Sequence, residues 1–290
     1  MGAKFKTFQR YAELDIANKI YYACIASCSI LLSLRKTLNF VFMKILVCIS
    51  AVPDTTSKIN FTADHKTFDP TGVQFVINPN DEFGLTRAVW LQEKQGAEVH
   101  VASVGEAPVE PILRKALAIG ANKAYRIDAH PQDGFFVANE LSKLVKKEGY
   151  DLVICGRESI DYNGNMVPGM IAEFCEYNFI NTCVGLELTE SGAKAIREID
   201  GGNETLACSL PLVIGAQKGL VEESDLKIPN MRGIMSARTK PLEVLPPSDT
   251  QSLTFDITFE KPAAKAAVTL VDPSDLDTLI QLLHKEANVL

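Results

Sequence analysis

The residues with the clearest potential for chemistry lie at 156–167, in a segment that reads GRESIDYNGNMV and follows a short apolar run. Gly156 and Gly164 let a ligand approach the backbone closely, because glycine has no Cβ. A helix is predicted to begin here, and its first turn presents unpaired N–H groups and the positive end of the helix dipole. These features favour a phosphate-binding loop, with a plain surface loop as the alternative.

Two further groups of residues could contact the same ligand. The motif NPND at 78–81 precedes an amphipathic segment, so Asn78 and Asp81 could contact an adenine or a ribose. Taken alone, these residue types directly before a helix more often cap it. Val104 and Gly105 end another apolar run, where backbone groups are free to meet a ligand or to form a simple turn.

Catalytic groups and the common nucleotide motifs are not evident in the chain. It has no G-x-G-x-x-G and no Walker loop, which disfavours an ordinary dinucleotide dehydrogenase or a P-loop enzyme. The four histidines are scattered, and the seven cysteines form no C-x-x-C pair. We therefore expect no metal site, no catalytic side chain and no disulfide framework, and we expect a reducing compartment.

The elements that must position these loops alternate between strand and helix. Strands are predicted at 44–50, 98–104, 124–128, 151–155 and 183–188, and helices from 78 to 96 and at 108–119, 133–147 and 165–176. This alternation predicts an α/β fold with a doubly wound, mainly parallel sheet, a Rossmann-like arrangement of three α/β/α layers. In such sheets ligands bind beyond the carboxyl ends of the strands, so the loops after Ser50, Val104 and Cys155 are the expected site.

The pattern changes after residue 190. Two strand-like runs flank Gly-Gly-Asn at 201–203 and predict a β-hairpin. A further strand is expected at 253–259 and a helix at 273–286. The last forty residues are too few for a core of their own. We therefore predict a nucleotide-binding domain at 43–245 and a C-terminal arm at 246–290 that packs on another protein.

Charge separates the first 42 residues from the rest of the chain. They carry six Lys/Arg against two Asp/Glu, whereas the whole chain has a net charge of −7, so the remainder is near −11. An acidic body disfavours nucleic acid as a partner. The apolar run at 20–34 is short for a membrane helix, so no stable membrane insertion is expected. We interpret 1–42 as a non-native or disordered extension before Met43, with an anchoring or targeting segment as the alternative.

One segment of the chain resembles a known family. REIDGGNETLACSLPLVIGA at 197–216 is similar to the signature of electron transfer flavoprotein beta subunits. Five further segments match that family in order: MKILVCISAVPDTT, NPNDEFGL, ALAIGANKA, GRESIDYNGNMVPGMIAE and IMSARTKPLEV. Together they cover residues 43 to about 245 and are highly specific.

The resemblance implies a heterodimer with an alpha subunit, in which alpha holds most of the FAD near the interface and beta buries an AMP. Glu198 matches an acidic position that meets the mobile FAD domain of alpha. The nucleotide is then expected against Cys48, Asn78, Pro79, Asn80, Asp81, Val104, Gly105, Gly156, Arg157, Glu158, Ser159, Ile160, Asp161, Gly164, Asn165, Met166 and Val167.

The implied function is electron transfer, in which FAD supplies the chemistry and beta supplies no catalytic side chain. Electrons would come from dehydrogenases, such as the acyl-CoA dehydrogenases of fatty acid β-oxidation, and pass toward a quinone-linked acceptor. The segment before Ile234 and Met235 resembles the loop that docks dehydrogenases, with Met231 where a leucine is usual. The implied location is the bacterial cytoplasm, with the mitochondrial matrix as the alternative.

Two alternatives remain open at this point. VPDTT at 52–56 resembles the relatives that bifurcate electrons from NADH, in which beta binds a second FAD instead of AMP. We expect one FAD plus AMP, with two FAD as the alternative. From another class, a stand-alone nucleotide-binding module of the universal-stress type would share the sheet but would lack the hairpin and the arm.

Overall fold

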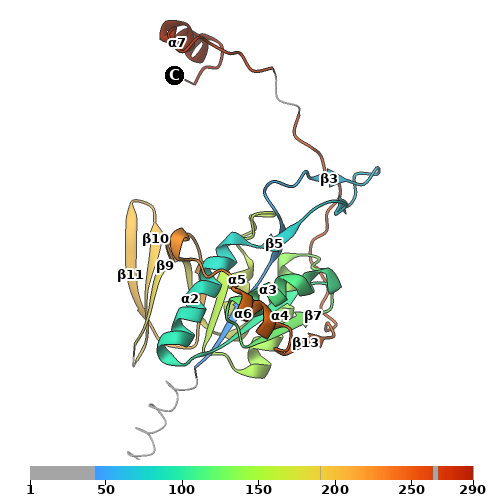
Figure 1. Cartoon of the computed structure of the whole chain (residues 1–290), viewed down its shortest axis with the longest axis vertical. Helices are drawn as coiled ribbons and strands as arrows, with labels where there is room; N and C mark the ends of the chain where they lie inside the picture. Colours follow the sequence, from blue (N-terminus) through green and yellow to red (C-terminus); the bar gives the residue numbers. More distant parts are fainter. Residues whose placement is uncertain (1–42, 190, 264–266, 290) are drawn as a thin grey trace, which may run out of the picture. The chain divides into compact units, whose positions relative to one another are not determined.

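The computed structural model describes residues 43–189, 191–263 and 267–289 (Figure 1). The predicted extension at 1–42 lies outside them. The chain divides into two units. The first contains the described residues up to Ile59 together with Pro70–Phe255, and the second contains Asn60–Asp69 together with the described residues from Asp256 onward.

A nine-stranded sheet in the order β11-β10-β9-β12-β8-β1-β6-β7-β13 forms the centre of the first unit. The strands from β9 to β13 in this order run parallel to one another. β10 runs antiparallel to β9, and β11 runs antiparallel to β10. This confirms the predicted mainly parallel sheet and the hairpin. The strand bounds are β1 Lys44–Cys48, β6 Glu98–Val104, β7 Lys123–Ile127, β8 Leu152–Gly156, β9 Asn178–Thr189, β10 Gly192–Ile199, β11 Gly202–Cys208, β12 Leu212–Ala216 and β13 Leu242–Leu245.

Helices cover both faces of this sheet, which confirms the three layers. Ile45 and Val47 of β1 pack in the core beneath α2 and α3, whereas Leu46 and Cys48 pack in the core beneath α4 and α5. This burial on both faces explains why β1 is apolar from Ile45 to Cys48. The helix bounds are α2 Pro79–Gln95, α3 Glu110–Ile119, α4 Gly134–Glu148 and α5 Val167–Cys175.

Local sequence explains where the helices begin and end. α2 begins with Pro79, which has the fixed φ of a first helical residue, and ends at Gly96, whose φ of 73° is left-handed. α4 is capped by Asp133, whose carboxylate accepts a hydrogen bond from Phe136 N at 2.7 Å.

The strand order places the reversal point between β1 and β8. From β1 the chain adds β6 and then β7 on one side, and it returns to the other side of β1 with β8. Beyond the carboxyl end of β1, the short strands β2 (Ala51–Pro53) and β5 (Phe75–Ile77) form an antiparallel pair. The loops after β1 and β8 therefore border the crevice where such sheets bind ligands.

β9 joins the parallel sheet to the hairpin. Its first residues pair with β12, and from Cys183 onward it pairs with β10 with a register shift near Arg197. Thr182, at the change of partner, has a φ of 49°. One long strand therefore extends the parallel sheet into the three-stranded antiparallel ribbon at its end.

The segment after β12 differs from the sequence-based expectation. α6 (Met231–Ala237) and β13 were not predicted, and α6 is capped by Asn230, which accepts from Gly233 N at 2.8 Å. The predicted strand at 253–259 is wrong, since those residues form no strand in the structure. Leu253 N and Thr254 N instead donate to the Asp133 carboxylate at 2.7 and 2.8 Å.

The second unit contains a small hairpin and a helix. β3 (Asn60–Phe61) pairs with β4 (Phe68–Asp69), and the ring of Phe61 stacks on Phe259 with centroids 4.9 Å apart. The predicted C-terminal helix is confirmed as α7 (Leu276–Lys285). Within the described part of the chain, no helix has the length and apolarity needed to cross a bilayer.

Candidate functional site

The Asp81 side chain bridges the point where the strand order reverses. Its Oδ2 accepts a hydrogen bond from Ser50 N after β1, and its Oδ1 accepts one from Gly156 N at the end of β8, both at 2.7 Å. The residue is 2% exposed, and burial raises the pKa of its carboxyl to about 7, against the lowering effect of its hydrogen-bond donors. Asp81 thus fixes the two loops that border the crevice.

Asn78 and Asn80 hold the loop after β8 in the same way. The side-chain amides of both residues donate to Glu158 O at 3.0 Å, and Asn78 Oδ1 accepts from Ile160 N at 3.2 Å. Asn78 stands at the cap position of α2, but its side chain makes no capping hydrogen bond. The capping role favoured from sequence is therefore wrong for this side chain, which positions the loop instead.

Gly156 is required by this arrangement. A Cβ at this position would lie 2.2 Å from Asp81 Oδ1 and 2.9 Å from Asn78 Nδ2. Gly156 was expected to let a ligand approach its backbone closely. In the structure, the side chains of the NPND motif make this close approach.

The loop at 157–166 is increasingly exposed along its length. Asn163 and Asn165 adopt φ values of 50° and 46°, a left-handed conformation that Asn tolerates better than most residues. Met166 packs on Gly134 at the start of α4. This loop, continued by the first residue of α5, carries nine of the predicted nucleotide contacts: Arg157, Glu158, Ser159, Ile160, Asp161, Gly164, Asn165, Met166 and Val167.

The remaining predicted contacts lie at the same edge of the sheet but on other strands. Val104 and Gly105 end β6, on the side of β1 away from β8, and Gly105 N donates to Ile127 O at 3.0 Å. Cys48 is buried at the end of β1. A hydrogen bond with Cys48 and burial raise the pKa of the Cys155 thiol, which keeps it protonated and unreactive.

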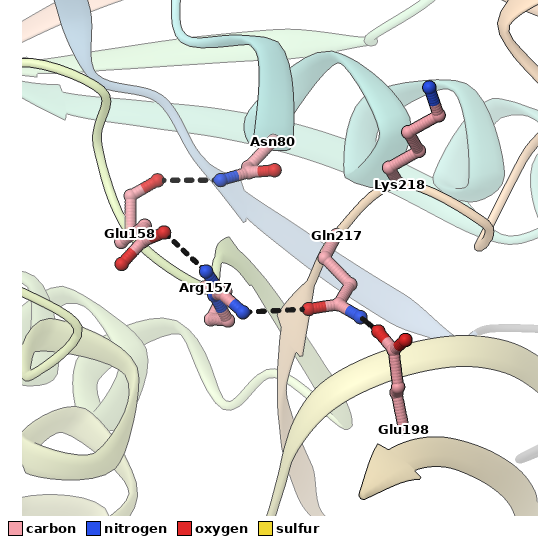
Figure 2. Close-up of a pocket in the computed structure, with 6 residues that line it drawn as sticks. All are labelled: Asn80, Arg157, Glu158, Glu198, Gln217 and Lys218. Atoms are coloured by element: carbon pink, nitrogen blue, oxygen red, sulfur yellow. Dashed lines mark hydrogen bonds and ion pairs between the residues drawn. The ribbon is translucent and has the colours of Figure 1, made fainter. Parts of the chain in front are cut away.

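A cavity of about 430 Å³ opens beside the loop after β8. Figure 2 shows the side chains that line it. Arg157 Nη1 donates to Gln217 Oε1 at 3.2 Å, and Gln217 Nε2 donates to Glu198 Oε2. Arg157 also pairs with the Glu158 carboxylate, while its buried Nε has no acceptor among the described residues. The cavity is lined by Asn80, Arg157, Glu158, Glu198, Gln217 and Lys218.

Sequence reasoning missed three residues of this region. Gln217 and Lys218 directly follow β12, and Asn181 on β9 donates to Asn165 Oδ1 at 2.9 Å. Gln217 and Lys218 could have been found from the apolar run LVIGA that precedes them, because this run predicts a strand. Residues that directly follow a parallel strand lie at the edge of the sheet where ligands bind.

The residues predicted to dock dehydrogenases lie together on α6. Met231, Ile234 and Met235 are 76%, 42% and 58% exposed, whereas Ala237 of the same helix is buried. A Cβ at Gly233 would lie 2.3 Å from Ala118 O, so α6 packs closely on α3. Glu198, the other predicted partner contact, lies at the cavity on β10 instead.

The described residues contain no group of three or more His, Cys, Asp or Glu side chains arranged to hold a metal ion. The side chains at the reversal point hydrogen-bond to backbone and to one another. The arrangement is that of a doubly wound α/β protein whose ligand-edge loops are fixed by a single Asn-Pro-Asn-Asp motif.

Comparison with known proteins gives this arrangement a family. Residues 66–250 match the family model described as the electron transfer flavoprotein domain. The "Electron transfer flavoprotein subunit beta" of Bacillus subtilis is 31% identical over 262 residues, which cover 86% of this chain and 100% of that protein. The human protein of the same name is 33% identical over 245 residues, 81% of this chain and 95% of that protein.

A third relative of that name, from Syntrophomonas wolfei, is 32% identical over 227 residues, 78% of this chain and 88% of that protein. The chain therefore belongs to the electron transfer flavoprotein family, as one of its beta subunits. The resemblance found in the sequence is confirmed, and membership in an electron-transfer family removes the alternative of a stand-alone universal-stress-type module.

Proposed function

We propose that this chain is the beta half of a heterodimeric electron transfer flavoprotein. The complex accepts electrons from dehydrogenases, such as acyl-CoA dehydrogenases, and passes them toward a quinone-linked acceptor. The observation that carries this proposal is the match to three beta subunits over 88%, 95% and 100% of their own lengths. FAD, held mainly by the alpha subunit near the interface, supplies the redox chemistry, and this chain supplies orientation and electrostatics.

The nucleotide of the beta subunit, AMP in this proposal, binds at the loops fixed by the NPND motif. The residues fit a phosphate group, since the buried Arg157 Nε has no acceptor among the described residues and the loop leads into the N-terminus of α5, the positive end of that helix's dipole. The exposed loop at 157–166, with Val104 and Gly105 at the end of β6, completes the proposed site.

Three surfaces meet partners in this proposal. Glu198 contacts the alpha subunit, and Met231 with its neighbours on α6 docks dehydrogenases. The arm at 246–290 packs on alpha, which is supported by its exposed apolar residues, among them Phe255 and Ile257. The buried, unpaired cysteines support a reducing compartment, either the bacterial cytoplasm or the mitochondrial matrix.

A second function is favoured by the loop at 52–56. Asp54 accepts hydrogen bonds from Thr56 N at 2.8 Å and Thr56 Oγ1 at 2.6 Å, which closes a turn just beyond β2. Because VPDTT resembles the bifurcating relatives, this turn supports a beta subunit that binds a second FAD and works with NADH.

Nucleotide extraction from the purified heterodimer tests both functions. One FAD and one AMP per heterodimer support the carrier, and two FAD without AMP support the bifurcating enzyme. A heterodimer without any flavin, or a chain that does not associate with an alpha subunit, would contradict both.

A further inference from the structure

Three side chains from three elements form one hydrogen-bonded row across the cavity, as Figure 2 shows. Arg157 follows β8, Gln217 follows β12 and Glu198 belongs to β10. Arg157 donates to the oxygen of the Gln217 amide, and the nitrogen of the same amide donates to Glu198. Gln217 therefore connects the loop after β8 to the hairpin.

The chemistry of the row requires a group at its centre that both accepts and donates hydrogen bonds, as an amide does. Arg157 can only donate hydrogen bonds, and the Glu198 carboxylate can only accept them, so the group between them must do both. Gln217 is 7% exposed, which makes an unpaired partner costly. A glutamate at this position would keep the bond to Arg157 and repel Glu198, and an apolar side chain would lose both bonds.

Each end of the row is anchored in a surface with a proposed ligand. The Arg157 guanidinium pairs with Glu158, whose backbone carbonyl is held by Asn78 and Asn80. At the other end, Thr182 Oγ1 donates to the backbone carbonyl of Glu198 at 2.8 Å. The backbone of Glu198 is thus fixed, and the hydrogen bond from Gln217 orients its carboxylate.

We propose that Gln217 is a positioning residue that couples nucleotide binding at the loop after β8 to the partner contact made by Glu198. This inference rests on the proposed function, which assigns a nucleotide to that loop and the alpha subunit to Glu198. A nucleotide phosphate that accepts from Arg157 Nε fixes the guanidinium while Nη1 stays bonded to Gln217. The amide then holds the Glu198 carboxylate in one orientation, so nucleotide and alpha subunit favour each other's binding.

The test measures the affinity of the full-length chain for the alpha subunit without nucleotide and with saturating AMP, with FAD as a parallel probe. The wild-type chain should bind alpha about fivefold or more tightly with nucleotide, the lower range of typical coupling. Because coupling is reciprocal, saturating alpha should raise the affinity for the same nucleotide by the same factor.

Gln217→Met preserves side-chain volume. In this variant the affinity for alpha should be about the same with and without nucleotide. Gln217→Glu keeps the Arg157 bond and should also lose the effect, which makes the test independent of how well the methionine variant folds. The matched control is Gln92→Met on α2, which removes a Gln side chain that donates to Asn122 Oδ1 at 2.6 Å. This control should keep the wild-type ratio of affinities.

The ratio of affinities distinguishes coupling from a merely structural role, which would weaken both states equally. A Gln217→Met chain that keeps the wild-type ratio overturns the inference, and so does a wild-type chain whose affinity for alpha ignores both nucleotides. Glu198→Gln tests separately whether Glu198 contacts the alpha subunit. If it leaves the affinity for alpha unchanged in both states, the assignment of Glu198 in the proposed function fails as well.

Discussion

Asp81 is a buried carboxyl group whose two oxygens accept backbone N–H groups from two different loops. Its pKa is raised to about 7, primarily by burial, from an ordinary value of 3.8. Because the pKa of Asp81 is higher in the folded chain than in the unfolded chain, protonation of this group adds to the free energy of unfolding. That contribution is complete below about pH 4 and is lost as the pH rises toward 7.

Asp81→Asn should destabilise the chain because the asparagine amide has one acceptor oxygen and turns an N–H group toward the second donor. Leaving one buried donor unsatisfied costs about 1–3 kcal/mol. The cost should be larger at pH 5 than at pH 8, because the stabilisation that protonated Asp81 gives the wild-type chain is lost over that range. Denaturant unfolding of both chains at the two pH values measures this difference. An equal or larger cost at pH 8 would contradict the raised pKa.

The glycines of the loop after β8 should differ sharply in tolerance. Gly156→Ala places a Cβ 2.2 Å from Asp81 Oδ1 and should separate the loops joined there, with a cost of about 1–3 kcal/mol. Gly164→Ala is the matched control, because its Cβ would meet only Met166 atoms at 3.7 Å or more. Thermal unfolding should show a lower Tm for Gly156→Ala alone. Equal Tm values would show that the loop yields without cost.

The residue types predicted much of this site, and the strand order explains what they did not predict. The NPND motif and the loop at 157–166 are recognisable because Asn, Asp and Gly before helices carry local meaning. Gln217 is 60 residues from Arg157 along the chain, and only the pairing of β12 with β8 brings them together. A side chain whose role depends on a long-range pairing has no local pattern to reveal it.

At the scale of elements, α4 holds the segment at 248–254, here called the strap. Glu140 on α4 is 4% exposed, and it accepts hydrogen bonds from Ser248 N at 3.0 Å and Thr250 Oγ1 at 2.6 Å. Burial acts to raise the pKa of Glu140, but the hydrogen bonds from Ser248 and Thr250 outweigh it and lower the pKa overall. The ionised carboxylate therefore holds the strap.

Glu140→Gln should loosen the strap, because the amide has one acceptor oxygen where the carboxylate has two. Hydrogen exchange of residues 246–255 should become at least about tenfold faster, as expected for a loss of about 1–3 kcal/mol. Because the pKa is lowered, the wild-type strap should also loosen as the pH falls through that lowered value. Glu148→Gln, the same change at the other end of α4, is the control. Unchanged exchange in Glu140→Gln would mean that backbone packing alone holds the strap.

α6 presents Met231 on a short helix that is fixed to α3. Met231→Ala should slow electron transfer from dehydrogenases while FAD content stays normal, because the lost side chain is 76% exposed and supports no core. Stopped-flow reduction by an acyl-CoA dehydrogenase measures the rate, and Ile59→Ala, another exposed apolar residue, is the control. Unchanged rates would remove Met231 from the docking surface.

The elements that sequence predicted well share a buried, repetitive pattern. β1, β6 and β8 are apolar runs, and α3 and α4 carry apolar residues at helical spacing. α6 is a helix of two turns whose exposed residues include three apolar ones, and β13 has four residues at a sheet edge, so neither shows an amphipathic periodicity. The predicted strand at 253–259 alternates apolar and polar residues, as a strand would. Asp133 accepts two of its backbone N–H groups instead, and a local pattern cannot show a contact with a side chain so far away along the chain.

For the whole molecule, α7 carries apolar residues that the described residues of its own unit do not bury fully. Leu276, Leu279, Ile280 and Leu283 follow helical spacing, and α7 contains no buried residue. Its amphipathic pattern is that of a helix that packs against another protein.

Leu279→Asp combined with Ile280→Asp should weaken binding to the alpha subunit by tenfold or more, since each buried aliphatic side chain contributes about 1.5–3 kcal/mol. The unfolding of the chain by itself should not change, because both residues are already exposed. Titration with alpha followed by calorimetry measures the affinity, and Gln281→Asp, an exposed polar residue of the same helix, is the control. Undiminished affinity would remove α7 from the interface.

The strap has a consequence for how this chain can diverge. Asp133 and Glu140 accept hydrogen bonds from the strap, the last of them from residue 254. These bonds do not depend on the residues that follow the strap. The described residues beyond Phe255 belong to the second unit, so substitutions there are constrained by contacts within that unit, such as the stack of Phe259 on Phe61, and by the surface that covers them. The part of the arm beyond the strap can therefore change in sequence together with its partner while the sheet and its ligand loops stay the same.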